Sequence, residues 1–235
     1  MSPPLESRNP PVPTPEILRG RRIAFVHDWL VGFRGGEKCL DLLCRRFPDA
    51  TLFTLLHRKG STSPAIERMP IASSWLNRLP RVSQYYRTLA PLMPSAIESL
   101  RIPHDVELIV SLSHAFAKGI RVPSGATHVC YCFTPMRYAW ERRGDYVSGG
   151  MLAPIKNLLL DRLRTWDQEN SSRVTKFVAI SETISQRLQS SYGVESAVVY
   201  PPVDVEYYTP SNVAREDFYL CVSALVPYKR LDLAV

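Results

Sequence analysis

The chain has 235 residues, of which 45% are hydrophobic and 22% charged, which is typical of a globular domain with one sizeable core. No apolar run approaches the ~18 residues of a membrane-spanning helix, and residues 1–20 lack the apolar segment of a secretory signal. The formal net charge of +7 favours anionic partners. We expect a cytoplasmic protein whose residues 1–20 form a disordered tail.

Apolar runs and helical patterns alternate along most of the chain. The runs predict strands at 23–26, 50–56, near Ile71, 107–112, 127–133, 174–180 and 196–200. Helical spacing of apolar residues predicts helices at 36–47, 82–100 (interrupted near Pro91 and Pro94), 151–169 and 182–192, the last capped by Ser181. Continuously apolar strands between helices indicate an α/β fold, a Rossmann-like doubly wound parallel sheet.

The domain organisation follows from where this alternation stops. Residues 21–205 form one predicted Rossmann-like domain. Residues 206–235 contain a polar linker, an apolar run at 218–223 and the start of a helix at Arg230, so they predict the truncated beginning of a second Rossmann-like domain. Because one strand and one helical turn cannot fold alone, we expect the native protein to continue for another domain.

Polar and glycine residues follow several predicted strands directly. Gly35 and Gly36 follow the first strand, His114 follows the strand at 107–112, and Ser181 follows the strand at 174–180. The carboxyl ends of parallel strands meet at one edge of a doubly wound sheet, where ligands bind. These residues are therefore candidates for one site.

The glycine loop at 32–36 does not fit a dinucleotide site. It lacks the G-x-G-x-x-G pattern, and no acidic residue ends the second strand, which disfavours an oxidoreductase that binds NAD. Gly35 and Gly36 nevertheless offer free helix amides to a phosphate or sugar oxygen, with a simple tight turn as the alternative. His114 is either structural or catalytic, and Lys229 is either a surface lysine or a ligand of a diphosphate.

The five cysteines predict no metal site. They are Cys39, Cys44, Cys130, Cys132 and Cys221, and no Cys/His cluster with zinc spacing accompanies them. We expect buried, reduced thiols and no bound metal.

A basic stretch lies between residues 58 and 101. It carries a net charge of +5, and apolar and aromatic residues such as Trp75, Tyr85 and Tyr86 interleave with its arginines. This pattern suits an anionic membrane surface, and it is equally typical of a solvated face over an ordinary helix. It also suits nucleic acid, which is not among the partners we expect.

Five fragments occur in the order found in glycosyltransferase family 4. They are VHDWL at 26–30 with GGE at 35–37, SLSHAFAKG at 111–119, TPMRYAW at 134–140, YPPVD at 200–204 and VPYKR at 226–230. Over residues 21–235 the chain therefore resembles this family, especially its mannosyltransferase-like branch. The resemblance implies a GT-B fold, a retaining transfer from a nucleotide sugar, and no required metal or other cofactor.

The resemblance also assigns roles to individual residues. Gly35, Gly36 and Lys229 would bind the donor diphosphate and sugar, and His114 would contact the transferred sugar as the catalytic residue. Asp28, Arg137 and Ser181 would lie in the acceptor-side cleft. Glycosyl transfer develops positive charge on the sugar and negative charge on the departing phosphate, which helix amides and a lysine can stabilise.

Three positions depart from the family pattern. Phe133 stands where relatives commonly have histidine, Ile180 where many have asparagine, and Ala224 where many have arginine. The first two changes remove polar groups near the expected cleft. The family's paired glutamates and most of its nucleotide contacts would lie after Val235.

Two functions remain open. The first is a glycosyltransferase that transfers a sugar, with mannose from GDP-mannose as the expectation from the branch, to a lipid-linked or polysaccharide acceptor in surface-polysaccharide synthesis. It would act in the cytoplasm, with peripheral contact to the inner face of the membrane. The second is a truncated, non-catalytic remnant that retains only the acceptor-side binding domain.

Overall fold

The computed structural model describes residues 15–140, 153–210, 212–214, 216–223 and 229–234. The chain divides into two compact units, Met1–Pro201 and Pro202–Val235, which are described separately below. The sequence placed this division after residue 205.

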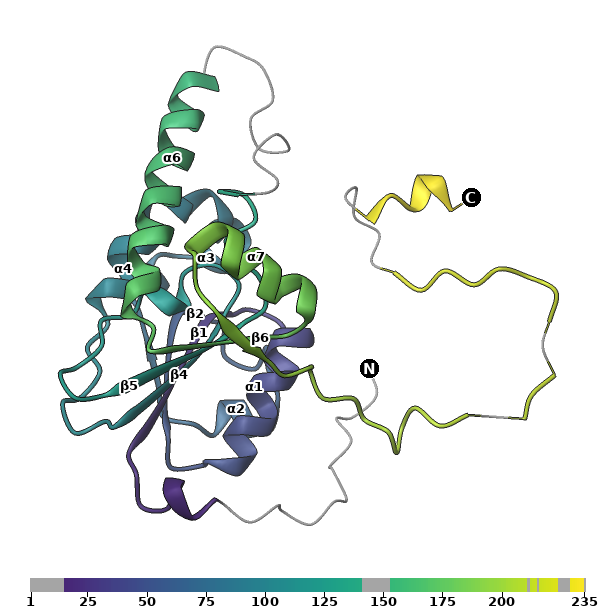
Figure 1. The fold of residues 1–235 in the computed structure, drawn as a ribbon, viewed down its shortest axis with the longest axis horizontal. Helices are drawn as coiled ribbons and strands as arrows, with labels where there is room; N and C mark the ends of the chain where they lie inside the picture. The colour runs from purple at the N-terminus through teal and green to yellow at the C-terminus, as the bar shows by residue number, and fades with distance from the viewer. Residues whose placement is uncertain (1–14, 141–152, 211, 215, 224–228, 235) are drawn as a thin grey trace. The chain divides into compact units, whose positions relative to one another are not determined.

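The first unit is built on a seven-stranded sheet with the order β3-β2-β1-β4-β5-β6-β7 (Figure 1). All six strand pairings are parallel. The strands are β1 (Ile23–Leu30), β2 (Thr51–His57), β3 (Ile71–Ser73), β4 (Leu108–Ser113), β5 (Thr127–Cys132), β6 (Lys176–Ala179) and β7 (Ser196–Val198). The order confirms the predicted doubly wound α/β fold, since the chain moves outward from β1 to β3 and then returns to β4 beside β1.

Helices cover both faces of this sheet (Figure 1). The α-helices are α1 (Gly35–Arg46), α2 (Pro64–Glu67), α3 (Val82–Tyr85), α4 (Met93–Ser99), α6 (Ala153–Glu169) and α7 (Glu182–Tyr192). Short 3-10 helices are η1 (Glu16–Leu18), η2 (Trp75–Arg78), η3 (Tyr86–Leu92), η4 (Ala117–Gly119), η5 (Asn170–Arg173) and η7 (Leu231–Leu233). Ser181 caps α7 as predicted, because its hydroxyl accepts the amide of Ile184 at 3.3 Å.

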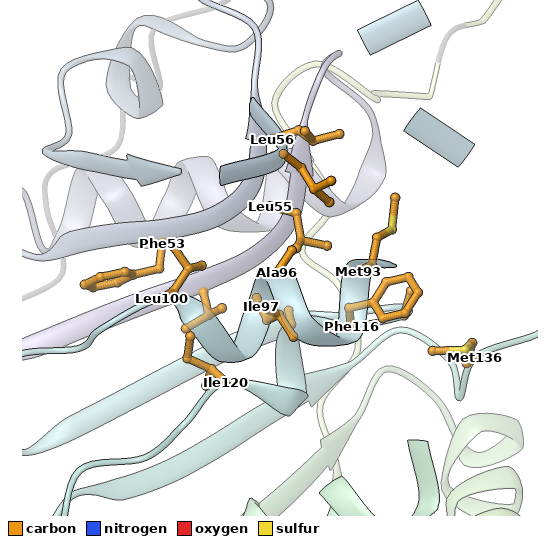
Figure 2. Close-up of a cluster of buried hydrophobic side chains, with 14 of the residues drawn as sticks. Phe53, Leu55, Leu56, Met93, Ala96, Ile97, Leu100, Phe116, Ile120 and Met136 are labelled. Carbon is orange, nitrogen blue, oxygen red and sulfur yellow. The ribbon is translucent and has the colours of Figure 1, made fainter. Parts of the chain in front are cut away.

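Two hydrophobic layers enclose the sheet. On one face, α1 and α2 bury residues such as Leu40 and Ile66 against Phe25 of β1. On the other face, α4 packs against β2 and η4 packs against β4 and β1, and Figure 2 shows Ile97 and Phe116 within this layer. A smaller cluster joins α7 to β5 and β6. Continuous burial on both faces explains why the strands are apolar along most of their length.

Three predicted elements differ from the structure. The first strand does not end at Val26 but continues to Leu30, because β2 and β4 flank it and supply backbone partners as far as His57 and Leu112. The helix at 82–100 forms as three elements, α3, η3 and α4. The predicted interruption near Pro91 is confirmed, but the whole segment Tyr86–Leu92 around it is a 3-10 helix instead of an α-helix.

The third difference lies in the second unit. Residues 218–223 form no strand, and residues 231–233 form one 3-10 turn instead of the start of an α-helix. Among the described residues of this unit no second strand pairs with the apolar run, and an isolated strand is not stable by itself.

Two further predictions concern the amino-terminal residues and the absence of a membrane-spanning helix. Residues 1–14 of the expected disordered tail lie outside the described residues, whereas Glu16–Leu18 form the turn η1. Among the described residues, no helix combines the length and the apolar composition needed to cross a membrane.

Candidate active site at the carboxyl edge of the sheet

The site is centred on Asp28, which β1 carries into the interior. Its side chain is fully buried, and its two oxygens accept the backbone amides of His114, Ala115, Phe116 and Ala117 at 2.6–3.1 Å. These amides belong to the turn that follows β4, on the other side of the point where the strand order reverses. Asp28 therefore fixes the turn at the edge where doubly wound folds bind ligands.

The same carboxylate holds the imidazole of His114. Nδ1 of His114 lies 2.8 Å from Oδ2 of Asp28, and the imidazole side chain remains 30% exposed. Burial alone would raise the pKa of Asp28, but the charge of His114 and its hydrogen bonds outweigh burial and hold the pKa well below the ordinary value. Asp28 is thus ionised throughout the physiological pH range.

The pKa of His114 moves in the opposite direction. Burial alone would lower it, but the Asp28 carboxylate, helped by Glu37, raises the pKa above the ordinary value of 6.5. Nδ1 donates to Asp28, and among the described residues no side chain or carbonyl is bonded to Nε2. The ring of Trp29 contacts the imidazole edge-on, with centroids 4.6 Å apart. The arrangement presents an oriented imidazole, whose protonated form Asp28 favours, at the sheet edge.

A second histidine lies beneath the start of α1. Nδ1 of His27 lies 3.1 Å from the carbonyl oxygen of Leu112, and Nε2 lies 3.6 Å from Oε1 of Glu37. The other oxygen of Glu37 accepts the amide of Arg34 at 2.9 Å, which closes the first turn of the helix. Burial would raise the pKa of Glu37, but His27 and the amide of Arg34 lower it.

The tandem glycines begin α1 at this edge. A Cβ at Gly36 would lie 3.3 Å from the Phe133 ring and 3.4 Å from the His27 ring, whereas a Cβ at Gly35 would meet nothing within 4 Å. Gly36 therefore allows the helix to approach β1 and β5 closely. The rings of His27 and His114 are 6.4 Å apart, so the helix start, with the free amides of its first turn, lies at the same edge as His114.

Of the other predicted site residues, Arg137 lies near His114, whereas Ser181 caps a helix and Lys229 lies in the second unit. Arg137 follows β5, is exposed, and its charge opposes protonation of His114, which indicates proximity to the imidazole. Ser181 uses its hydroxyl to cap α7 at the end of β6, and no contact joins it to His114. Lys229 belongs to the second unit, whose position relative to His114 is not defined.

Asp28 differs from its sequence-based role. It was expected to face the acceptor-side cleft, but it is fully buried and points its oxygens at five donors of the protein itself. Its oxygens accept four backbone amides of the turn that carries His114. Asp28 is therefore a positioning residue for His114.

Sequence reasoning missed a buried ion pair next to this turn. Lys118 on η4 bonds to Asp167 on α6, and the side chains are 2% and 0% exposed. The second oxygen of Asp167 accepts Nε1 of Trp140 at 2.8 Å and the hydroxyl of Tyr192 at 2.6 Å. The available signal was an acidic residue at position 167 on the apolar face of the predicted helix at 151–169.

The cysteines and potential metal ligands add no second centre. Cys39, Cys44, Cys130 and Cys132 are buried free thiols, and Cys221 is exposed. In the part of the chain that the structure describes, no cluster of three or more His, Cys, Asp or Glu side chains has the geometry to hold a metal ion.

Comparison with known proteins gives matches only among solved structures, since no family model and no curated protein matches the chain. The apo form of the lipopolysaccharide outer core galactosyltransferase WaaB is 14% identical with a TM-score of 0.42, and the match covers 77% of this chain and 46% of that chain. Anabaena Alr3699/HepE in complex with UDP is 13% identical with a TM-score of 0.46, covering 81% of this chain and 47% of that chain. The chain thus spans about half the length of these structures.

Proposed function

We propose that the chain is the acceptor-side part of a retaining glycosyltransferase of the GT-B, family 4 type, which takes its sugar from a nucleotide-sugar donor. The observation that carries the proposal is the pairing of His114 with buried Asp28, beside the glycine start of α1, at the reversal of strand order. Two of the fragments that resemble the family, at 26–37 and 111–119, supply these residues. The Nε2 side of the His114 imidazole and the amides at the start of α1 lie at one edge of the sheet, and both suit an anionic sugar carrier.

The chemistry follows from where charge develops. The bond from the sugar to the donor diphosphate breaks, the acceptor hydroxyl passes its proton to the departing diphosphate, and the acceptor oxygen forms the new glycosidic bond. In the proposal, the amides of Gly35 and Gly36, with Lys229, stabilise the departing diphosphate, while Arg137 and Ser181 face the acceptor side. Asp28 accepts from Nδ1 of His114 and favours its protonated form, and in the proposal Nε2–H donates to an oxygen of the transferred sugar. We propose no metal or cofactor for this step.

The finer specificity rests on the motif resemblance alone. We propose mannose from GDP-mannose as the donor and a lipid-linked or polysaccharide acceptor in surface-polysaccharide synthesis. The test is a donor screen in which GDP-mannose, UDP-galactose and UDP-glucose are offered to the chain, alone and joined to any sequence that its gene encodes after Val235. Transfer from any of the three supports glycosyltransferase activity, and preference for GDP-mannose supports the branch.

The alternative is a non-catalytic protein that retains only the acceptor-side binding domain. In its favour, the described residues of the second unit form no strand. Binding of a saccharide acceptor without transfer from any donor, in both forms of the protein, would favour this alternative.

We also propose that the protein works at the cytoplasmic face of an anionic membrane. The basic stretch exposes Trp75, Tyr85 and Leu92 to 38–44% near the exposed arginines Arg78 and Arg87. Apolar side chains bordered by arginine favour insertion at an anionic lipid surface. Sedimentation with phosphatidylglycerol vesicles should fall strongly when Arg78, Arg81 and Arg87 are changed to Glu. Equal binding by both proteins would remove the membrane from the proposal.

A further inference from the structure

Two adjoining hollows lie beside the carboxyl end of β1, and both are lined by Val31 and Ser83. The first has a volume of about 160 Å³ and includes Arg58 and Arg81. The second has a volume of about 300 Å³ and includes Arg34, Arg87, Tyr85 and Tyr86. Together they are called the arginine groove below.

The charge of the arginine groove is not balanced by its own lining. Four arginines contribute to it, and none of the residues that line either hollow is acidic. Elsewhere in the first unit arginines pair with carboxylates, as Arg45 does with Asp41 and Arg121 with Glu98. No such pair with a described acidic residue is formed by the four arginines of the groove. Two arginines line each of the two adjoining hollows, so positive charge is concentrated along the groove.

One of these arginines also has an unusual backbone. Arg81 adopts a left-handed conformation with φ 52° and ψ 26°, although it is not glycine. Such strained residues persist only where the surrounding structure imposes them, and they cluster at ligand sites. Arg81 is the N-cap residue of α3 and lines the first hollow.

The arginine groove reaches the candidate active site through two aromatic rings. Tyr86 lines the second hollow and lies 5.1 Å from the ring of Trp29, which in turn lies 4.6 Å from the ring of His114. The guanidinium of Arg87 lies over the outer side of Tyr86, with 5.6 Å between Cζ and the ring centroid. These ring contacts place the second hollow two aromatic side chains away from His114.

We infer that the arginine groove binds a phosphate-type oxyanion carried by the acceptor. A guanidinium presents paired N–H donors that match two oxygens of a phosphate, and several guanidinium groups suit a diphosphate. The role as an acceptor subsite rests on the proposed function, whereas binding of the oxyanion does not. A lipid headgroup and a soluble sugar phosphate both offer this chemistry.

The test follows inorganic pyrophosphate by ¹H–¹⁵N NMR on the whole chain. We expect amide shifts at Ser83 and Thr88 beside the arginine groove. The double variant Arg58→Gln/Arg87→Gln should bind pyrophosphate at least about tenfold more weakly, because charge-assisted hydrogen bonds are lost. The control, Arg19→Gln/Arg101→Gln, removes the same charge from exposed positions before β1 and β4, at the opposite edge of the sheet. It should retain the wild-type affinity.

Two results would overturn the inference. The first is equal loss of affinity in both double variants, which would indicate only a general effect of net charge. The second is a set of shifts confined to Gly35 and Gly36, which would place the anion at the start of α1. Because the dispersion of the same spectra reports folding, a misfolded variant is recognised directly and is replaced by Arg87→Lys, for which a smaller loss is expected.

Further experiments distinguish a lipid headgroup from a soluble sugar phosphate, and separate the oxyanion site from the proposed glycosyltransferase function. Binding to phosphatidylcholine vesicles that contain an isoprenoid diphosphate, lost in Arg58→Gln/Arg87→Gln, identifies a lipid headgroup; binding of mannose 1-phosphate without vesicle binding identifies a soluble source. Either supports the arginine groove as an oxyanion site. The variant His114→Ala should still bind pyrophosphate, so a failure of sugar transfer would leave this result intact.

Discussion

Replacing Asp28 by Asn tests the link between the buried carboxylate and the turn after β4. The substitution keeps the shape of the side chain but turns one acceptor oxygen into an NH₂ group. Each oxygen of Asp28 accepts two backbone amides, so at least two amide donors would face a donor in the variant. At about 1–3 kcal/mol for each unsatisfied buried group, we expect a loss of about 2–6 kcal/mol in the free energy of unfolding.

The measurement is urea unfolding, with Asp105→Asn as the matched control. Asp105 forms an exposed ion pair with Arg22, which should contribute at most about 1 kcal/mol. A second readout is the pKa of His114 by NMR, which should fall in Asp28→Asn because the carboxylate that raises it is gone. Equal stability losses in the two variants, together with an unchanged pKa of His114, would refute the role of Asp28.

The pH dependence of stability supplies a related check on this pair. Since the folded pKa of His114 lies above 6.5, its proton stabilises the fold fully below about pH 6.5, and this contribution is lost as the pH rises through the folded value. The lowered pKa of Asp28 acts in the acid range, where its contribution is present above pH 3.8 and is lost as the pH falls below that value.

Three further predictions concern buried groups around the site. Lys118→Met should lower the free energy of unfolding by about 3–5 kcal/mol because it leaves Asp167 charged and unpaired, and Lys118→Met/Asp167→Asn should recover part of this loss in urea unfolding. Gly119→Ala should destabilise by about 1–3 kcal/mol in the same assay, since the new Cβ would lie 2.4 Å from the ring of Trp166; unchanged stability would show that the ring moves freely. Burial lowers the pKa of His128 to about 4 in the folded protein, so the unfolded chain binds a proton at this residue at a higher pH than the folded protein does. The free energy of unfolding should therefore fall by about 3 kcal/mol between pH 6.5 and 4. Unfolding measured at several pH values should show a smaller fall in His128→Asn.

The sequence predicted the fold because its signals are local. Apolar runs of strand length and helical spacing of apolar residues reflect burial on both faces of a parallel sheet, and these patterns identify the strands up to β7. The hydroxyl of Ser181 and the breaks near Pro91 are likewise set by the residue itself. The predicted topology alone put Gly36 and His114 at one edge of the sheet. The structure confirms this placement, because the ring of His27 lies next to both Gly36 and the ring of His114.

The remaining features depend on contacts between distant segments. Polar His27 and Asp28 resemble the end of a strand, but neighbouring strands and the amides of residues 114–117 make a buried extension of β1 favourable. Likewise, nothing in the local sequence around Lys118 identifies Asp167 as its partner 49 residues later. A run at 218–223 that looks like a strand stays irregular because strand formation requires a neighbour.

The most direct test of the proposed reaction compares His114→Asn with the wild type in the transfer of mannose from GDP-mannose, using the protein with any sequence encoded after Val235. The amide of Asn can keep the bond to Asp28 that Nδ1 makes, but it removes Nε2. We predict a fall of at least about a hundredfold in the transfer rate, which exceeds any fall in the folded fraction that unfolding measurements on the same variant report. An unchanged rate, or a rate that falls only as far as the folded fraction does, would contradict a role for this imidazole in the reaction.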